Sequence, residues 1–120
     1  MKKCTDIEQS KKLIELGIDI NTADMMWDDW SLIDEGWKLS VGYYPEIEKD
    51  YGRKCYPAWS LAALLEVLPE FKIEKTKAED GYEGYYYFVS YKNLIAVPYN
   101  KELIDGFVEM FVSLKNEDLL

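Results

Sequence analysis

The sequence contains no histidine, one arginine and two cysteines among its 120 residues. Without an imidazole, serine and cysteine triads that depend on a histidine base are excluded, and the commonest zinc ligand is missing. Cys4 and Cys55 match no metal-binding or redox spacing, so we expect free thiols in a reducing compartment. We therefore predict neither a metal nor a cofactor, and any catalysis would depend on carboxylate, lysine or tyrosine groups.

Long hydrophobic runs are also missing. Stretches such as Leu61 to Leu65 are far shorter than the roughly 20 residues that cross a bilayer. Cys4, Asp6 and Glu8 stand where a signal peptide would need apolar residues. The sequence therefore predicts a cytoplasmic protein that has no membrane partner.

Basic residues are few, since 14 lysines and arginines face 23 acidic residues, which gives a net charge of -9. Phosphate recognition needs clustered cations, so nucleic acid is not an expected partner. An apolar fraction of 48% with 15% aromatic residues argues against intrinsic disorder. We expect a single folded domain over residues 1–120, either a monomer or a homodimer.

The first half of the chain predicts a helix, a hairpin, a loop and a second helix. Thr5 and Glu8 fit a capping box that opens a helix over residues 6–16, and Gly17 can end it. Alternating apolar residues predict a β-hairpin with strands near 30–32 and 37–41. Prolines and a glycine predict a loop over 44–57, and an apolar helix at the centre of the domain is expected over 61–68, ended by Pro69.

The second half predicts mostly strands. Residues 71–75 and 85–91 form a hairpin through a turn at 79–81, and a short strand over 94–97 stops at Pro98. Asn100 can cap a final helix, whose apolar positions recur every three or four residues up to Leu114. The predicted fold class is α+β: an antiparallel sheet of two hairpins plus a short strand, packed with three helices.

Acidic residues gather in one segment. No lysine or arginine occurs between Leu13 and Trp37, while the segment holds seven acids: Glu15, Asp19, Asp24, Asp28, Asp29, Asp34 and Glu35. Their spacing fits no calcium loop, and adjacent carboxylates such as Asp28 and Asp29 point apart in a helix or a strand. The acids form either a solvated face or a contact surface for a basic partner.

Tryptophans interleave with these acids at Trp27, Trp30 and Trp37. Indoles on a hairpin can belong to the core, but they can also cage a cation or anchor a protein interface. Our leading hypothesis is a non-enzymatic protein that binds another protein through an acidic and aromatic surface. Its predicted residues are Asp24, Trp27, Asp28, Asp29, Trp30, Asp34, Glu35 and Trp37.

A tyrosine cluster supports two alternatives. On a strand, Tyr85, Tyr87 and Tyr91 share one face and Tyr86 and Phe88 the other, so both faces are aromatic. Helices could cover one face, or the three tyrosines could line a pocket of a small-molecule-binding protein or a carboxylate-dependent enzyme. A variant of the leading hypothesis rests on the acidic residues instead: a nucleic-acid mimic whose carboxylates imitate phosphates.

Three blocks of the chain carry a resemblance. They are CTDIEQSKKL at 4–13, TADM at 22–25 and PAWSLAALLEVLP at 57–69. Together they resemble small uncharacterised proteins of phages and prophages in gut anaerobic bacteria. The resemblance implies a mobile element and an accessory or host-interaction role. That family has no assigned activity, so the resemblance implies no functional residue.

Overall fold

The computed structural model describes residues 2–30, 36–67, 70–77, 84–92, 95–100 and 102–119, with residues 95–100 described by their backbone alone. The elements in chain order are α1 (Ile7–Glu15), η1 (Ile20–Thr22), β1 (Met25–Asp29), β2 (Trp37–Val41), α2 (Glu46–Tyr51), β3 (Cys55–Ala58), α3 (Leu61–Val67), β4 (Phe71–Lys77), β5 (Tyr85–Tyr91), β6 (Ile95–Asn100) and α4 (Leu103–Asn116). The predicted α+β class is confirmed. The strands are divided between two antiparallel sheets, ordered β2-β1-β3 and β4-β5-β6.

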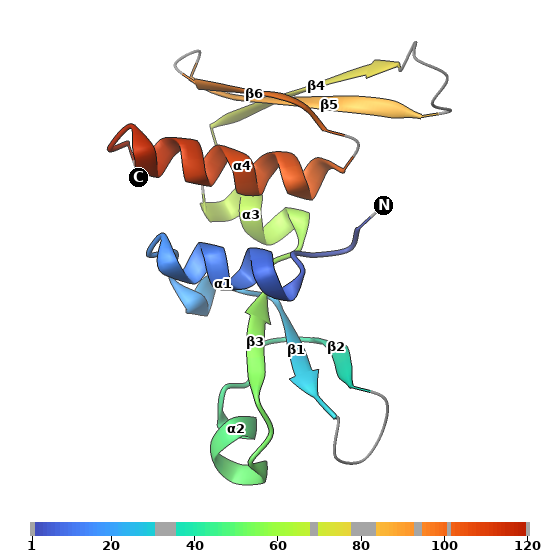
Figure 1. Ribbon diagram of the computed structural model, residues 1–120, viewed down its shortest axis with the longest axis vertical. Coiled ribbons are helices and arrows are strands. Elements are labelled where there is room, and N and C mark those ends of the chain that lie inside the picture. The colour runs from blue at the N-terminus through green and yellow to red at the C-terminus, as the bar shows by residue number, and fades with distance from the viewer. Residues whose placement is uncertain are drawn as a thin grey trace.

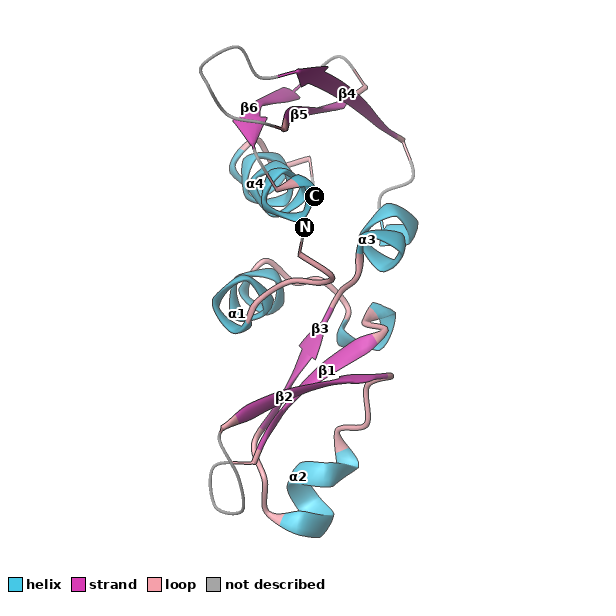
Figure 2. Ribbon diagram, turned by 90° about the vertical axis from the view of Figure 1, so that its right-hand side faces the viewer, coloured by secondary structure: helices cyan, strands magenta, loops and turns pink. Residues whose placement is uncertain are grey.

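The elements are stacked along the longest axis of a molecule that measures 46 × 36 × 20 Å. The sheet β4-β5-β6 lies at one end against α4, and α3 and α1 lie on the other side of α4 (Figure 1). The sheet β2-β1-β3 and α2 project from this body at the opposite end, as Figure 2 also shows. We call the projecting part, residues 25–30 and 36–58, the arm.

The main core is built around α4, whereas the sequence predicted a central position for the helix at 61–68. Eight residues of α4 are buried, but only Ala63 and Leu64 of α3 are. The difference arises because α4 is enclosed by β5 and β6 on one side and by α1 and α3 on the other. Phe71 from β4 completes the cluster by packing edge-on against Phe107, with ring centroids 4.4 Å apart.

The first helix has the predicted capping box, but one residue later than expected. The carboxylate of Asp6 accepts the backbone N–H of Gln9 at 2.7 Å, and the Gln9 side chain accepts the Asp6 N–H at 3.0 Å. Thr5 is instead fully buried, and its hydroxyl lies 2.8 Å from that of Ser10. Gly17 ends the helix with φ +89°, as expected.

The first strand of the arm begins earlier than predicted. Residues 25–29 pair with β2 in register from Met25–Val41 to Asp29–Trp37, whereas the sequence indicated a strand near 30–32. The alternation was hidden because the buried face of β1 carries Asp28 next to Met26. The predicted loop over 44–57 was also wrong, since it contains α2, which Gly52 ends with φ +68°, and the edge strand β3.

The β4–β5 hairpin is confirmed, with a regular register from Phe71–Tyr91 to Lys77–Tyr85. The third strand continues past Pro98 to Asn100, because the register with β5 shifts between Tyr87 and Val89. Proline has no backbone N–H to donate, so it is found on edge strands and at such irregularities, where that hydrogen bond is not needed. The final helix follows Glu102 rather than an Asn100 cap. Pro69, Leu94 and the turn at 79–81 lie outside the described residues.

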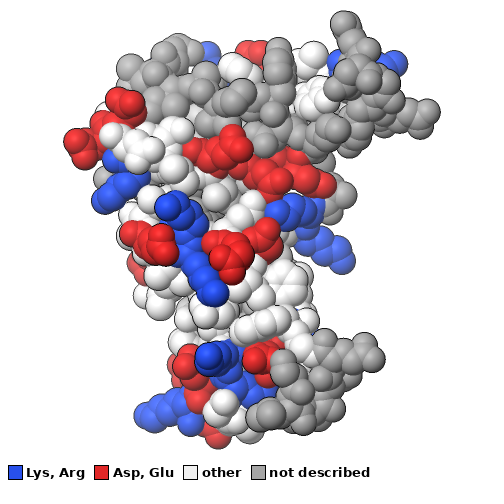
Figure 3. All heavy atoms as spheres, in the orientation of Figure 1, with Lys and Arg blue, Asp and Glu red and all other residues white. Residues whose placement is uncertain are grey.

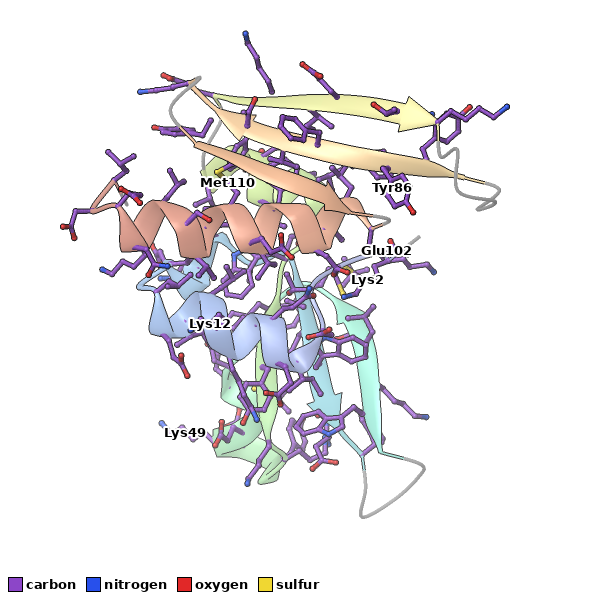
Figure 4. The ribbon with its side chains drawn as sticks, turned by 45° about the horizontal axis from the view of Figure 1, so that its top comes forward. Lys2, Lys12, Lys49, Tyr86, Glu102 and Met110 are labelled. Atoms are coloured by element: carbon purple, nitrogen blue, oxygen red, sulfur yellow. The ribbon has the colours of Figure 1, made fainter. Side chains whose placement is uncertain are left out.

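The N-terminal segment is tied to the start of α4, where Lys2 and Glu102 lie side by side (Figure 4). The backbone N–H of Lys2 donates to Glu102 at 2.9 Å, and its ammonium donates to Asp105 at 2.7 Å and Asp6 at 3.2 Å. Burial is the largest single influence and would lower the pKa of Lys2, but the hydrogen bonds and charges of Asp105 and Asp6 together outweigh it and raise the pKa. Within the described chain, no helix is both long and apolar enough to span a bilayer.

Candidate functional site: the α2 groove

The residues of the predicted acidic and aromatic surface are separated by the arm sheet. Trp27, Asp29 and Trp37 lie on the face toward α1, where Asp29 is paired with Trp37. Asp28 and Trp30 belong to the opposite face, which α2 covers in part. Asp34 and Glu35 fall outside the described residues.

Asp24 is engaged at the base of the arm. One carboxylate oxygen accepts the backbone N–H of Ser60 at 2.9 Å, and the other accepts the Ser60 hydroxyl. The Ser60 oxygen in turn accepts the N–H of Ala63 at 3.3 Å, which caps the first turn of α3. Asp24 therefore helps to join the arm to the body.

Two tryptophan side chains serve the same junction. The indole N–H of Trp27 donates to the carbonyl of Thr5 at 2.9 Å, and that of Trp59 donates to the Thr22 hydroxyl at 2.9 Å. Trp37 differs, because 37% of it is exposed and its ring contacts Tyr56 at a centroid distance of 5.6 Å. Trp37 is thus the exposed aromatic residue of the α1-facing side.

Arg53 is not among the residues that the sequence predicted for this surface, yet it holds Asp28 in place. Its Nε and Nη2 each donate to a different carboxylate oxygen of Asp28 at 3.0 Å. Asp28 is 5% exposed, and the Arg53 side chain is 18% exposed. The indole of Trp30 donates to Asp28 at 3.0 Å, and the guanidinium lies 4.4 Å over the centre of the Trp30 ring. The one available sequence signal was that Arg53 is the only arginine of the chain.

This arrangement favours the charged form of Arg53. The hydrogen bonds with Asp28 are the main cause that raises the pKa of Arg53. Both oxygens of Asp28 accept hydrogen bonds from other side chains, and such bidentate pairs have a well-defined geometry. Asp28 is therefore a structural carboxylate and not an exposed acidic contact.

A groove of about 420 Å³ lies over this pair, between the sheet and α2. Its apolar lining residues are Met26, Leu39, Val41, Tyr44 and Ile47, and its polar ones are Asp28, Trp30, Lys38, Ser40 and Arg53. We call it the α2 groove. Because four consecutive residues of β2 line it, the groove follows the outer edge of this strand.

The groove has a strongly exposed apolar rim. Val41 is 82% exposed and Tyr44 is 58% exposed. Gly42 lies between them with φ +85°, and a β-carbon there would approach the Tyr44 ring to 2.8 Å. The glycine therefore allows the aromatic ring to lie against the backbone at the end of β2.

Two cations belong to the lining of the groove. Among the described residues, Lys38, Arg53 and the carboxylate of Asp28 are the charged groups that line it. The Lys38 ammonium lies 5.5 Å over the centre of the Trp30 ring. The groove therefore contains two of the 14 basic side chains of a protein whose net charge is -9.

The other acids of the segment are distributed among local contacts. Glu15 pairs with Lys12 at 3.8 Å, and the Asp19 side chain accepts the N–H of Asn21 at 2.9 Å to cap η1. Figure 3 shows acidic and basic side chains mixed across one face of the body, over α1 and α4. Among the described acids of this segment, Asp24 and Asp28 turn inward and so do not belong to an exposed acidic row.

The predicted tyrosine pocket residues lie on the face of β5 that is turned toward α4. Tyr87 and Tyr91 pack against the main core, and Tyr85 is exposed with the ammonium of Lys75 3.9 Å from its ring centre. Among the described residues, no group of three histidine, cysteine or acidic side chains could hold a metal ion. Burial is the main cause that raises the pKa of the Cys4 and Cys55 thiols, which makes both poor nucleophiles near neutral pH.

Comparisons with known proteins give no relative from which a role could be inferred. A scan against protein-family models, a search of curated proteins and a search of solved structures found no match.

Proposed function

We propose that this protein is a non-enzymatic accessory protein that binds another protein through the α2 groove. The observation that carries the proposal is the combination of a rim of exposed Val41 and Tyr44 with a floor fixed by Arg53, Asp28 and Trp30. Aromatic and arginine side chains are enriched where protein interfaces gain most of their binding energy.

The position of the groove supports a protein partner over a small metabolite. The groove follows the edge of β2 for four residues, and Val41 at its rim is almost entirely in solvent. Small-molecule sites instead enclose most of their ligand. The tyrosine pocket has less support, because Tyr87 and Tyr91 are engaged with the core.

The proposed surface keeps part of the surface predicted from the sequence. Trp30 and Asp28 belong to it, but Asp28 acts by holding Arg53 and not by contacting the partner. The resemblance of three blocks to phage and prophage proteins is the reason to seek the partner among cytoplasmic proteins of a bacterial host.

The test compares two tyrosine variants in affinity capture from host lysate. Tyr44→Ser removes an exposed ring from the groove rim, whereas Tyr85→Ser removes a ring of 43% exposure from the other sheet. We expect Tyr44→Ser to lose the captured protein and Tyr85→Ser to retain it. Retention by Tyr44→Ser together with loss by Tyr85→Ser would move the site to the tyrosine cluster.

A further inference from the structure

We infer that the partner binds as an extended segment that adds a fourth strand to the outer edge of β2 and places a carboxylate over Lys38 and Arg53. This inference rests on the proposed function, because it specifies the partner of the same groove. Strand addition supplies affinity through main-chain hydrogen bonds and specificity through alternate side chains.

The hydrogen-bond pattern of the arm sheet shows which backbone groups of β2 face outward. The N–H of Gly42 donates to the carbonyl of Asp24 at 2.7 Å, and that of Trp30 donates to Gly36 at 2.9 Å. In an antiparallel pair, every second residue exchanges these bonds with its neighbour. With the observed register, residues 36, 38, 40 and 42 point their backbone groups at β1.

The backbone groups of Trp37, Leu39 and Val41 therefore point away from β1. In the described part of the chain, β2 is the terminal strand of its sheet, so these three N–H and three C=O groups line its outer edge. These three residues alternate along β2 in a regular register, so their outward-facing backbone groups form a template for an incoming strand.

The composition of β2 also favours addition at this edge. Natural edge strands are blocked by charged side chains, proline or bulges. The edge strand β4 has four charged residues among seven, whereas β2 has Lys38 alone among five. The edge strand β6 contains a register irregularity, but β2 pairs with β1 at all five positions without a shift.

The lining of the groove specifies the side chains of the added strand. Side chains of a strand alternate between two faces, so every second residue of the partner would lie on the α2 side. There it meets the cations of Lys38 and Arg53 and the apolar rim of Tyr44 and Ile47. Because the carboxylate of Asp28 already accepts three hydrogen bonds, the groove favours an acidic residue flanked by apolar ones.

The experiment selects ligands from a phage-displayed library of random peptides on the immobilised wild-type protein. We expect enriched peptides with an acidic residue and alternating apolar residues.

Leu39→Pro removes one outward N–H but no hydrogen bond with β1, so it should weaken binding by about tenfold or more. Thermal unfolding of this variant checks that the arm remains folded.

A second measurement leaves the protein unchanged. Methylation of single backbone nitrogens in a selected peptide should weaken binding at every second position, since an added strand turns alternate N–H groups toward β2.

Lys38→Glu should weaken binding about tenfold or more relative to Lys72→Glu, which places the same charge change on β4.

Three outcomes would overturn strand addition. They are the absence of enriched peptides, equal binding to wild type and folded Leu39→Pro, and a methylation profile without a period of two. A wild-type dimer that Leu39→Pro dissociates would instead assign the edge to a second copy of this chain and also overturn the inference. If Tyr44→Ser loses the captured partner while Leu39→Pro keeps it, the proposed function stands and strand addition fails.

Discussion

Arg53 donates to both carboxylate oxygens of Asp28, from Nε and Nη2 at 3.0 Å each, across 25 positions of sequence. The pair connects the segment between α2 and β3 to the central strand of the arm. Trp30 completes it by donating to the same carboxylate and by stacking under the guanidinium. The floor of the α2 groove is therefore a rigid unit whose parts depend on one another.

Replacing Arg53 by lysine keeps the positive charge but removes the planar fork of donors. We expect Arg53→Lys to unfold at a lower urea concentration than wild type and to change the fluorescence of Trp30. Lys49→Arg on exposed α2 is the matched control and should leave both unchanged. An unchanged urea midpoint in Arg53→Lys would show that the bidentate geometry does not stabilise the arm.

Phe111 is fully buried in the main core, where its ring centroid lies 6.0 Å from that of Phe71. Phe111→Ala should lower the free energy of unfolding by about 3–5 kcal/mol, because burial is lost and a cavity is created. Chemical denaturation measures this difference. The control Leu119→Ala, at an exposed position, should stay within about 0.5 kcal/mol of wild type. A Phe111→Ala protein as stable as wild type would contradict the packing described.

Asp6 caps α1 and also pairs with Lys2 at 3.2 Å on a partly exposed surface. Asp6→Ala should cost about 1 kcal/mol, the usual value for a lost N-cap. Asp6→Asn retains a capping oxygen, and exposed ion pairs contribute little, so its cost should be smaller. Equal losses in urea unfolding would mean that the ion pair, and not the cap, carries the effect.

The Cys4 thiol has a pKa above its ordinary value of 9.0, first because of burial and second because of nearby Asp24. Near pH 9.0 and above, the unfolded chain therefore releases the thiol proton more readily than the folded protein does. The contribution of the protonated Cys4 thiol to the free energy of unfolding is fully present below pH 9.0 and is lost as the pH rises through the folded-state pKa. In a Cys55→Ser background, alkylation at about pH 8 should be slow in buffer and fast in urea. Fast labelling of the folded protein would contradict the burial of Cys4.

The sequence predicted elements whose signal is local. The apolar positions of α4 recur at helical spacing, and the β4–β5 hairpin is dense in strand formers, so both were found. The strand β1 was misplaced because Asp28 occupies a buried position, which is possible only with Arg53 as its partner. A carboxylate that pairs with a distant residue has no local signature, so the sequence alone predicts an acidic surface for this segment.

The residues of the α2 groove also lack a local signature in the sequence. Trp30 and Asp28 were among the predicted residues, but Lys38, Tyr44 and Arg53 entered only when the sheet register and α2 placed them around one groove. The exposed apolar residue Val41 looked like an ordinary strand position in the sequence. Its 82% exposure follows from the position of β2 at the edge of the sheet.

The most direct test of the α2 groove is site-specific photo-crosslinking in host cells. A benzophenone amino acid replaces Tyr44 at the groove rim or, as the control, Tyr85 on the other sheet. The account predicts a discrete crosslinked protein from position 44, lost when Lys38→Glu is added, and no such product from position 85. A product from position 85 together with none from position 44 would contradict the claim that this protein acts through the α2 groove.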